Sequence, residues 1–489
     1  MPRPRFHICY LPPNVLYEIF MLYLQTPSKG MEGSKNVPML TFSPSTTSSP
    51  VTLSLVNRRW RSIVLHYPQF WSSMFVVGPH LLHANLVKLW LVRSGNRPLD
   101  LAFNQSLGLF APADHMHAMN YLLHTFMKYS ARWRSINFNF HGPVALSHRL
   151  EHSVLFTSTN LKHLPMLKAA TIFESDAWLT NPALPRMWAS IVQNSPQLRT
   201  VCAGVPVLSA SLSSFDCHSS LLSFSLVLRV LRDCPNLREI SARLRPPVGP
   251  EEDAPPIVHR KLKVLRLHNS KPGKLVEAVI SRVTLPKLTE LDMTFDSGPE
   301  LIRSLRYMIK RSDCRLLSIN TLPFDGVETE TFKLLSLEQL EYLTSLVICR
   351  AHGDSLLEWL TLRPPHKRNA SAAKMNLPYL NNLEFIGLTA SFGILAEMLA
   401  SRPRANIVIE TPWHFDEHPG SSKWARWVFE HPSLKFKNPC GCVVTNPQKA
   451  QPWYSAGVDE DTSCPQTGCR APRCRYESKS SRRYSNAAR

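Results

Sequence analysis

The sequence is short of glycine, of acidic side chains and of long apolar runs. Its 489 residues hold 18 glycines against 40 prolines, a balance that favours many interrupted elements and turns over one compact sheet. The most apolar run, 221–231, contains Ser223, Ser225 and Arg229 and is too short to span a bilayer. The opening stretch MPRPRFHICYLPP has no apolar segment of the length found in signal peptides. We therefore expect a protein of the cytosol or nucleus with no membrane segment.

The sequence also lacks the motifs of the common catalytic sites. It contains no phosphate-binding loop, no G-x-S-x-G elbow and no glycine-rich dinucleotide turn. Residues 414–418 spell H-x-x-E-H, an order that binds zinc only when both histidines lie one turn apart on a stable helix. Pro412 and Pro419 bracket the motif, so that helix has no room to form. The sequence predicts that the chain is not an enzyme and has no catalytic residue, metal site or cofactor.

The eleven cysteines fall into two groups. Six are spread singly, several within apolar runs, where a reduced cysteine behaves as a small buried hydrophobic residue. Five lie in the last fifty residues as Cys440-x-Cys442 and Cys464-x4-Cys469-x4-Cys474. These spacings differ from the C-x2-C pairs of zinc knuckles, and the intervening segment is rich in Pro, Gln and Ser. Residues 437–489 are therefore predicted to form a disordered basic tail, with zinc binding as the alternative.

Basic residues outnumber acidic ones, 56 to 36, which gives a net charge of +20. A basic surface attracts phosphate. However, residues 470–489 alone hold seven Lys or Arg and one Glu, and the other charges are scattered without the interleaved aromatic residues of single-strand binders. Nucleic acid is accordingly not the expected partner.

Three short segments near the N-terminus predict a small helical domain. Residues 11–24 and 52–65 have helical apolar spacing, with Thr52 as the expected cap of the second helix, and residues 66–76 bring Phe70 and Trp71 just after Pro68. Sixteen of the twenty-six residues in 25–50 are Pro, Ser, Thr or Gly, so this insert is expected to be a flexible loop. A domain of about fifty ordered residues is marginal alone, which favours a partner that covers its remaining apolar surface.

These segments resemble the F-box family. The family pattern runs LP, LL, IF, then V-C-[KR]-x-W-R-x-[IL] and P-x-[LF]-W. The chain has Leu11-Pro12, Val15-Leu16, Ile19-Phe20, VNRRWRSI (56–63) and PQFW (68–71) in the same order, with Asn57 in place of the usual cysteine. The resemblance implies an all-α F-box domain at residues 1–80 that docks on a Skp-type adaptor and, through it, on cullin and RING subunits. The family's adaptor-binding positions correspond to Leu11, Pro12, Leu16, Ile19, Phe20, Val56, Trp60, Ile63 and Trp71.

A short phrase then recurs along the chain: a Pro or basic residue followed by Leu-x-x-[LIV]-x-[apolar]. Its first leucines are Leu167, Leu198, Leu237, Leu262, Leu288, Leu316, Leu343 and Leu380. Four successive steps of 25–28 residues are typical of leucine-rich repeats, in which a strand begins each unit and a helix returns. Helical spacing at 221–231, 274–283, 300–311, 331–340, 355–362 and 394–401 agrees with this pattern, whereas PPVGPEEDAPP (246–256) predicts a loop. Each repeat leucine is expected in the core.

The same alternation begins earlier, with helices expected at 84–95 and 115–130 and strands at 97–103 and 132–140. Segments of the form W-L-x-R-S-G…PL-x-L and S-x-R-W-R-x-[IL] resemble the F-box-like proteins abundant in mushroom-forming fungi. Trp90, Pro98-Leu99 and Arg132-Trp133-Arg134 carry that likeness. The expected fold class is α/β, in which the short all-α F-box domain is followed by an irregular leucine-rich-repeat-like α/β solenoid at 81–436 and then by the disordered tail.

The expected function follows from the resemblance. It is the substrate-recognition subunit of an SCF-type ubiquitin ligase, in which tethering raises the effective concentration of a target protein held on the repeat array. One alternative is a repeat interaction protein with a vestigial F-box, and another is a basic nucleic-acid-associated protein. The repeats carry no readable code for the target, because their defining positions are core leucines.

Overall fold

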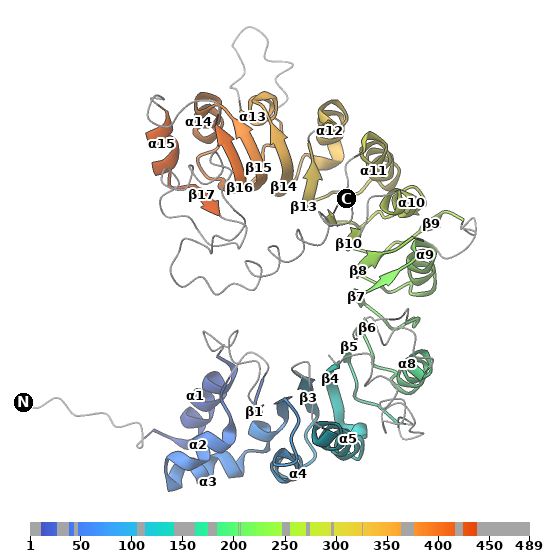
Figure 1. Cartoon of the computed structure of the whole chain (residues 1–489), viewed down its shortest axis with the longest axis vertical. Coiled ribbons are helices and arrows are strands. Elements are labelled where there is room, and N and C mark those ends of the chain that lie inside the picture. The colour runs from blue at the N-terminus through green and yellow to red at the C-terminus, as the bar shows by residue number, and fades with distance from the viewer. Residues whose placement is uncertain are drawn as a thin grey trace, which may run out of the picture. The chain divides into compact units, whose positions relative to one another are not determined.

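The computed structural model describes the chain in two compact units, Met1–Leu222 and Ser223–Arg489 (Figure 1). The described residues are 11–26, 39–43, 47–104, 113–140, 161, 163–174, 183–203, 205, 207–246, 255–269, 274–294, 298–324, 326–362, 376–415 and 424–437. The predicted tail at 437–489 lies outside these ranges apart from Lys437.

The first unit begins with a cluster of short helices. They are α1 (Pro13–Gln25), α2 (Pro50–Val56), α3 (Arg58–His66) and the 3-10 turn η3 (Pro68–Trp71). The single helix predicted at 52–65 is therefore wrong, because the backbone of Asn57 is extended and its Oδ1 accepts a hydrogen bond from the Trp60 N–H at 2.8 Å. Such a side-chain cap satisfies an orphan donor of the new helix. Ser49, not Thr52, caps the preceding helix by accepting from the Val51 N–H.

A sheet follows directly from these helices. Strand β1 (Met39–Thr41) pairs antiparallel with β2 (Ser73–Val77), and each later strand pairs in parallel with the one before it. These are β3 (Leu99–Asn104), β4 (Trp133–Phe140), β5 (Ala169–Glu174), β6 (Thr200–Ala203) and β7 (Ser214–Leu222). Helices α4 (His83–Arg93), α5 (Ala113–Met127) and α8 (Ala183–Asn194) lie between successive strands in the chain. Part of the predicted 25–50 insert is thus a strand of the sheet, while 27–38 and 44–46 lie outside the described residues.

The second unit repeats one helix–strand plan. Its parallel strands pair in chain order: β8 (Glu239–Leu244), β10 (Val264–Asn269), β12 (Glu290–Thr294), β13 (Ser318–Pro323), β14 (Ser345–His352), β15 (Asn382–Ala390), β16 (Asn406–Phe415) and β17 (Leu434–Lys437). Its helices are α9 (Phe224–Asp233), α10 (Leu275–Ile280), α11 (Pro299–Ser312), α12 (Glu328–Leu335), α13 (Ser355–Leu360), α14 (Phe392–Ser401) and α15 (Ala425–Glu430). Two short strands, β9 (Ile257–Val258) and β11 (Val283–Thr284), pair in parallel beside them. Figure 1 shows α11 to α14 on one side of β12 to β16.

The core lies between the helices and the strands. All eight repeat leucines are buried, seven of them fully and Leu380 with 3% of its surface exposed, so their predicted place in the core is confirmed. Their burial follows from the period-two alternation of strands, which turns every second side chain toward the helices. The described chain is therefore an α/β array of solenoid type with a long parallel sheet. Each helix–strand repeat buries its leucines against the neighbouring repeat.

Several strands carry no leucine phrase and were not predicted. Strand β7 lies in the serine-rich stretch between Leu198 and Leu237, where Phe215 and Cys217 are fully buried and alternate with less buried neighbours. Strand β16 follows Ala405, which is 3% exposed and takes the place of a repeat leucine. Of the loop predicted at 246–256, residues 247–254 lie outside the described ranges.

A row of backbone irregularities crosses the later strands of the second unit. Thr321 in β13, Arg350 in β14 and Gly387 in β15 have φ values of 65°, 57° and 74°. The register shifts between Ile319 and Leu322 and again beside Gly387. Arg350 and Gly387 face one another, because Cys349 pairs with Ile386 and Ala351 with Leu388. These are β-bulges, which bend a strand and increase its twist.

None of the helices within the described ranges combines the length and the hydrophobicity of a membrane-spanning segment.

Candidate partner-binding surfaces

Four of the nine predicted adaptor-binding residues lie inside the helical cluster. Leu16, Phe20, Ile63 and Trp71 are between 0 and 6% exposed. The Phe20 ring centroid is 4.6 Å from that of Trp60, and the Trp71 Nε1 donates to the Val64 carbonyl at 2.9 Å. These side chains hold α1, α3 and η3 together, because buried aromatic rings add specific packing to their apolar area.

The other five predicted residues reach the surface. Leu11, Ile19 and Trp60 are half-buried, and Pro12 and Val56 are exposed, Val56 by 55%. The start of α1 is fixed against α3 because Arg59 Nη2 donates to the Leu11 carbonyl at 2.6 Å. Pro12 accepts from the Leu16 N–H at 3.0 Å, which satisfies the first carbonyl of the helix.

Further apolar side chains lie exposed on the same helices. They are Val15, Leu22 and Tyr23 on α1, Leu55 on α2 and Leu65 on α3, between 38 and 68% exposed. The α1 members fall, with Ile19, at positions i, i+4, i+7 and i+8, which is one stripe of the helix beside the buried stripe of Leu16, Phe20 and Leu24. We call these five side chains, together with the exposed Val56 and the half-buried Ile19, the helical apolar face. Of these seven, only Ile19 and Val56 are among the predicted adaptor-binding residues; Val15, Leu22 and Tyr23 were missed in this role although they have the spacing of the α1 stripe, and so were Leu55 and Leu65.

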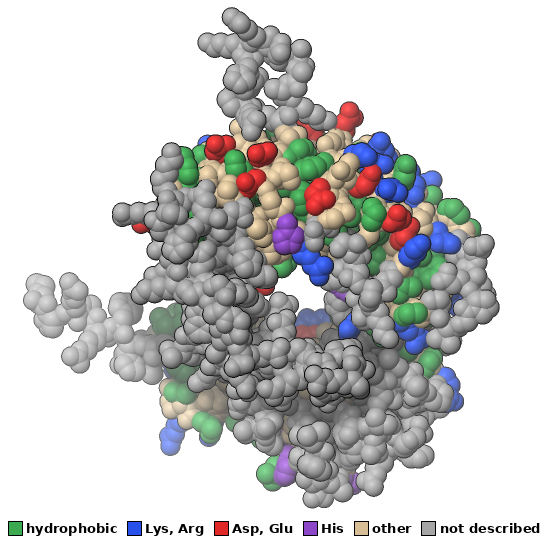
Figure 2. Space-filling model, turned by 45° about the horizontal axis from the view of Figure 1, so that its top comes forward, with side chains coloured by type: hydrophobic (Ala, Val, Ile, Leu, Met, Phe, Trp, Pro, Cys, Tyr) green, Lys and Arg blue, Asp and Glu red, His purple; other side chains and the backbone are tan. Residues whose placement is uncertain are grey.

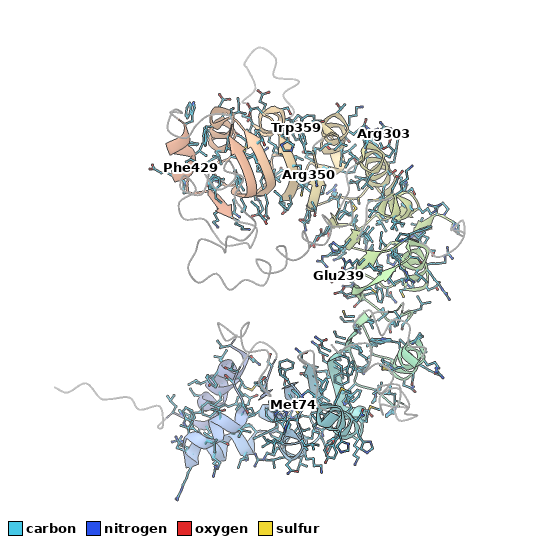
Figure 3. All side chains as sticks on the ribbon, in the orientation of Figure 1. Met74, Glu239, Arg303, Arg350, Trp359 and Phe429 are labelled. Carbon is cyan, nitrogen blue, oxygen red and sulfur yellow. The ribbon has the colours of Figure 1, made fainter. Side chains whose placement is uncertain are left out.

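A second surface is formed by the strand side chains of the second unit that point away from the helices. Arg266 of β10 pairs with both Glu239 of β8 and Glu290 of β12, and Lys437 of β17 pairs with Glu384 of β15 at 3.3 Å. Figure 3 labels Glu239 and Arg350 on these strands and Arg303 and Trp359 on the helices. Figure 2 shows acidic and basic side chains interspersed on the visible part of the described surface.

The residues with catalytic or metal-binding potential do not come together in the described part of the chain. No three His, Cys, Asp or Glu side chains there are placed to hold a metal ion. His414 lies in strand β16 and not on a helix, while residues 416–418 of the same motif and the cysteines from Cys440 onward lie outside the described ranges. Burial raises the pKa of Cys202 to about 12 and of Cys314 to about 11, so these thiols are poor nucleophiles at neutral pH.

Comparisons with known proteins give limited similarity. No family model matches the chain, and no curated protein matches its sequence. Two solved structures are similar over 67% of the chain: the leucine-rich repeat-containing protein LegL7 from Legionella pneumophila, at 10% identity and 92% of its own length, and a protein from Bacteroides fragilis, at 12% identity and 80% of its length. Both superpose with a TM-score of 0.29. At this TM-score neither likeness defines the fold, which rests on the chain's own strands and helices.

Proposed function

We propose that the chain is the substrate-recognition subunit of an SCF-type ubiquitin ligase, in which the α1–η3 cluster docks on a Skp-type adaptor and the leucine-rich-repeat-like array holds a target protein. The observation that carries the proposal is the helical apolar face. Seven large apolar side chains lie outside the core of a cluster of about fifty residues. Exposed apolar patches of this density mark protein interaction sites.

The division of the F-box-like residues supports the same proposal. Leu16, Phe20, Ile63 and Trp71 form the core of the cluster, whereas Leu11, Pro12, Ile19, Val56 and Trp60 border solvent. One short sequence pattern therefore supplies both a stable cluster and a surface with an apolar centre. Arg58, Arg59 and Arg61 are exposed on α3, so a partner with acidic residues at its rim is favoured.

Adaptor co-purification tests the proposal. Leu11→Ala combined with Pro12→Ala is expected to weaken adaptor binding by about 1 kcal/mol or more, because interface anchors lose that much on truncation. Val56→Ser in the same background is expected to weaken it further without unfolding the cluster, since Val56 is 55% exposed.

The matched control is Leu82→Ser, just before α4, with Val92→Ser on α4; both are exposed apolar residues outside the helical apolar face. Adaptor capture by this control should equal that of the wild-type chain, and the thermal melting of every variant should be unchanged. A wild-type chain that never captures the adaptor would favour the alternative, an interaction protein with a vestigial F-box.

A further inference from the structure

Basic side chains gather where the early strands of the second unit begin. Arg238, Lys261, Lys263, Lys287 and Arg315 each stand directly before or after a repeat leucine, and all five are exposed. Strands β8, β10, β12 and β13 pair in parallel from Glu239, Val264, Glu290 and Ser318. Because neighbouring strands lie about 4.8 Å apart, the side chains that precede the leucine (Lys261, Lys287 and Arg315) form one line, and those that follow it (Arg238 and Lys263) form a second beside it. We call these five residues the basic edge.

Three carboxylates near the basic edge in sequence form ion pairs with other residues, while Asp313, two residues before Arg315, accepts a hydrogen bond from Gln339 Nε2 at 3.2 Å. Glu239 and Glu290 both pair with Arg266, and Asp233 pairs with Arg229. Within the described ranges, no residue of the basic edge forms an ion pair. Lys261 donates to the amide oxygen of Asn236 at 2.5 Å. The five exposed basic side chains therefore present cationic charge, and Glu239 and Glu290 beside them are paired with Arg266.

A pocket of about 480 Å³ opens beside Lys261. Its apolar lining comes from Leu231, Pro235, Ile257 and Val258, and its cationic lining from Arg232, Arg260 and Lys261. The loop that shapes it is held by His259, whose Nδ1 accepts from the Leu262 N–H at 3.1 Å and whose Nε2 lies 3.1 Å from the Cys234 carbonyl oxygen. The pocket is open to solvent and combines apolar with cationic side chains, the two kinds of group that an acidic segment with an apolar residue would contact.

We propose that the basic edge and this pocket bind an extended acidic segment of a protein, with one apolar side chain of that segment in the pocket. In an extended segment, side chains on one face recur about every 7 Å, a spacing that flexible Lys and Arg side chains on adjacent strands can follow. The proposal rests on the proposed function, because it assigns the segment to the ligase's target.

The lining favours a peptide over a single-stranded nucleic acid. Single-strand binders place aromatic rings where successive bases stack, whereas the walls of this pocket are aliphatic and prolyl. Tyr342 and Tyr379, whose ring centroids lie 5.5 Å apart at 11°, are not among the residues that line the pocket; the Arg315 guanidinium lies 5.3 Å from the Tyr342 ring centroid.

Fluorescence anisotropy with the full chain and a labelled peptide of alternating Glu and Leu tests the charge requirement. Lys261→Glu with Lys263→Glu is expected to weaken binding about tenfold, because it places like charge against the peptide. The matched control, Arg243→Glu with Lys274→Glu, changes the net charge equally. Arg243 lies near the C-terminal end of β8 and Lys274 caps the start of α10. This control variant should weaken peptide binding less than about twofold, since charges beyond a Debye length from the peptide are screened. Equal loss in both variants would overturn the proposal.

The role of the pocket is tested by comparing peptides with and without an apolar side chain. Wild-type protein is expected to bind the Glu/Leu peptide about fivefold more tightly than a Glu/Ser peptide, and Val258→Ser to reduce that ratio, because a buried apolar side chain loses its contact. Val258 is 62% exposed, so this substitution leaves the fold intact. A labelled oligodeoxythymidylate that binds more tightly than the Glu/Leu peptide and is lost in Lys261→Glu with Lys263→Glu would assign the site to nucleic acid and overturn the proposal.

Adaptor co-purification separates the two proposals. All of these variants should still capture a Skp-type adaptor. Adaptor capture without peptide binding would overturn the acidic-segment site alone, and peptide binding without adaptor capture would overturn the ligase function alone.

Discussion

Arg402 is a buried arginine of the second unit that binds the backbone at residue 360 and at residues 376 and 377, which are well separated in sequence from it. Only 4% of its surface is exposed. Its Nε donates to the Leu360 carbonyl at 2.8 Å, and its Nη1 and Nη2 donate to the carbonyls of Leu377 and Asn376 at 2.9 and 2.7 Å. Burial lowers its pKa to about 10, so the guanidinium is still charged at neutral pH. One side chain therefore holds together the described residues on both sides of 363–375.

Substitutions of Arg402 measure how much these hydrogen bonds contribute to the stability of the chain. Arg402→Leu is expected to lower the free energy of unfolding by about 3 kcal/mol, since three buried carbonyls lose their donor. The free energy of unfolding of Arg402→Lys should lie between those of the wild-type chain and Arg402→Leu, because an ammonium lacks the planar fork that reaches three acceptors. Urea unfolding followed by circular dichroism measures both variants. Arg404→Leu, at an exposed neighbouring position, is the control, and an equal loss in this control would contradict the assigned role.

The sequence predicts the burial of leucines far better than that of Arg402. A repeat leucine is apolar, so its local pattern and its final environment agree. Arg402 and Arg404 stand two residues apart in SRPRA and are equivalent in local pattern. Only the carbonyls of residues 360, 376 and 377, brought close by the fold, distinguish them.

At the scale of elements, the row of bulges departs most from ideal geometry. Thr321 and Arg350 hold a left-handed backbone conformation, which crowds the Cβ of any residue other than glycine. Gly387, at the position facing Arg350, has no such cost. The bulges follow one another on consecutive paired strands, so their bends add along the row rather than cancel.

The backbone strain at Arg350, caused by its left-handed conformation, can be tested by substitution with glycine. Arg350→Gly is expected to be about 1 kcal/mol more stable than Arg350→Ala, because both remove the same charged side chain and only glycine accepts the φ of 57° without strain. Chemical denaturation of the two variants gives the difference directly. If alanine proved as stable as glycine, the bulge would not be a strained feature of the protein in solution.

Elements with strong periodicity were predicted, and elements defined by tertiary pairing were not. The amphipathic pattern at 300–311 gave α11 almost to the residue, because its apolar stripe and its caps act locally. The helix predicted at 331–340 extends too far toward the C-terminus, since α12 ends at Leu335 and a separate 3-10 turn spans Glu338–Leu340. Strand β1 has only three residues and is defined by its partner β2, a contact across more than thirty residues that no local pattern records.

At the scale of the whole molecule, the chain divides into two compact units between Leu222 and Ser223, and the boundary predicted after residue 80 stays a prediction. Strand β2 ends at Val77 and pairs with β3, and the Trp90 Nε1 of α4 donates to the Ser73 carbonyl of β2 at 3.1 Å. The helical cluster and the first strands thus share backbone pairing and buried aromatic rings.

The second unit is expected to fold alone. A fragment of residues 223–437 contains strands β8 to β17 and helices α9 to α15 with their buried leucines. It should unfold cooperatively in urea and show mixed helix and strand signals by circular dichroism, because each repeat buries its core against its neighbours. A fragment of 81–222 should fold less well, because it lacks β2 as a partner for β3. Non-cooperative melting of 223–437 would show that the unit depends on the preceding residues.

The pairing of strands in chain order has a consequence for how such a protein can change over generations. Within the main sheet of the second unit, strands β10, β12, β13, β14, β15 and β16 each lie between two parallel partners, and these partners follow the order of the chain once the separate pair β9 and β11 is set aside. Loss or duplication of one helix–strand unit in the gene would bring together two edges of the same kind, with no long-range connection to rewire. The number of helix–strand repeats, and with it the length of the sheet, can therefore change by whole repeats between descendants of one ancestral chain while the fold is kept.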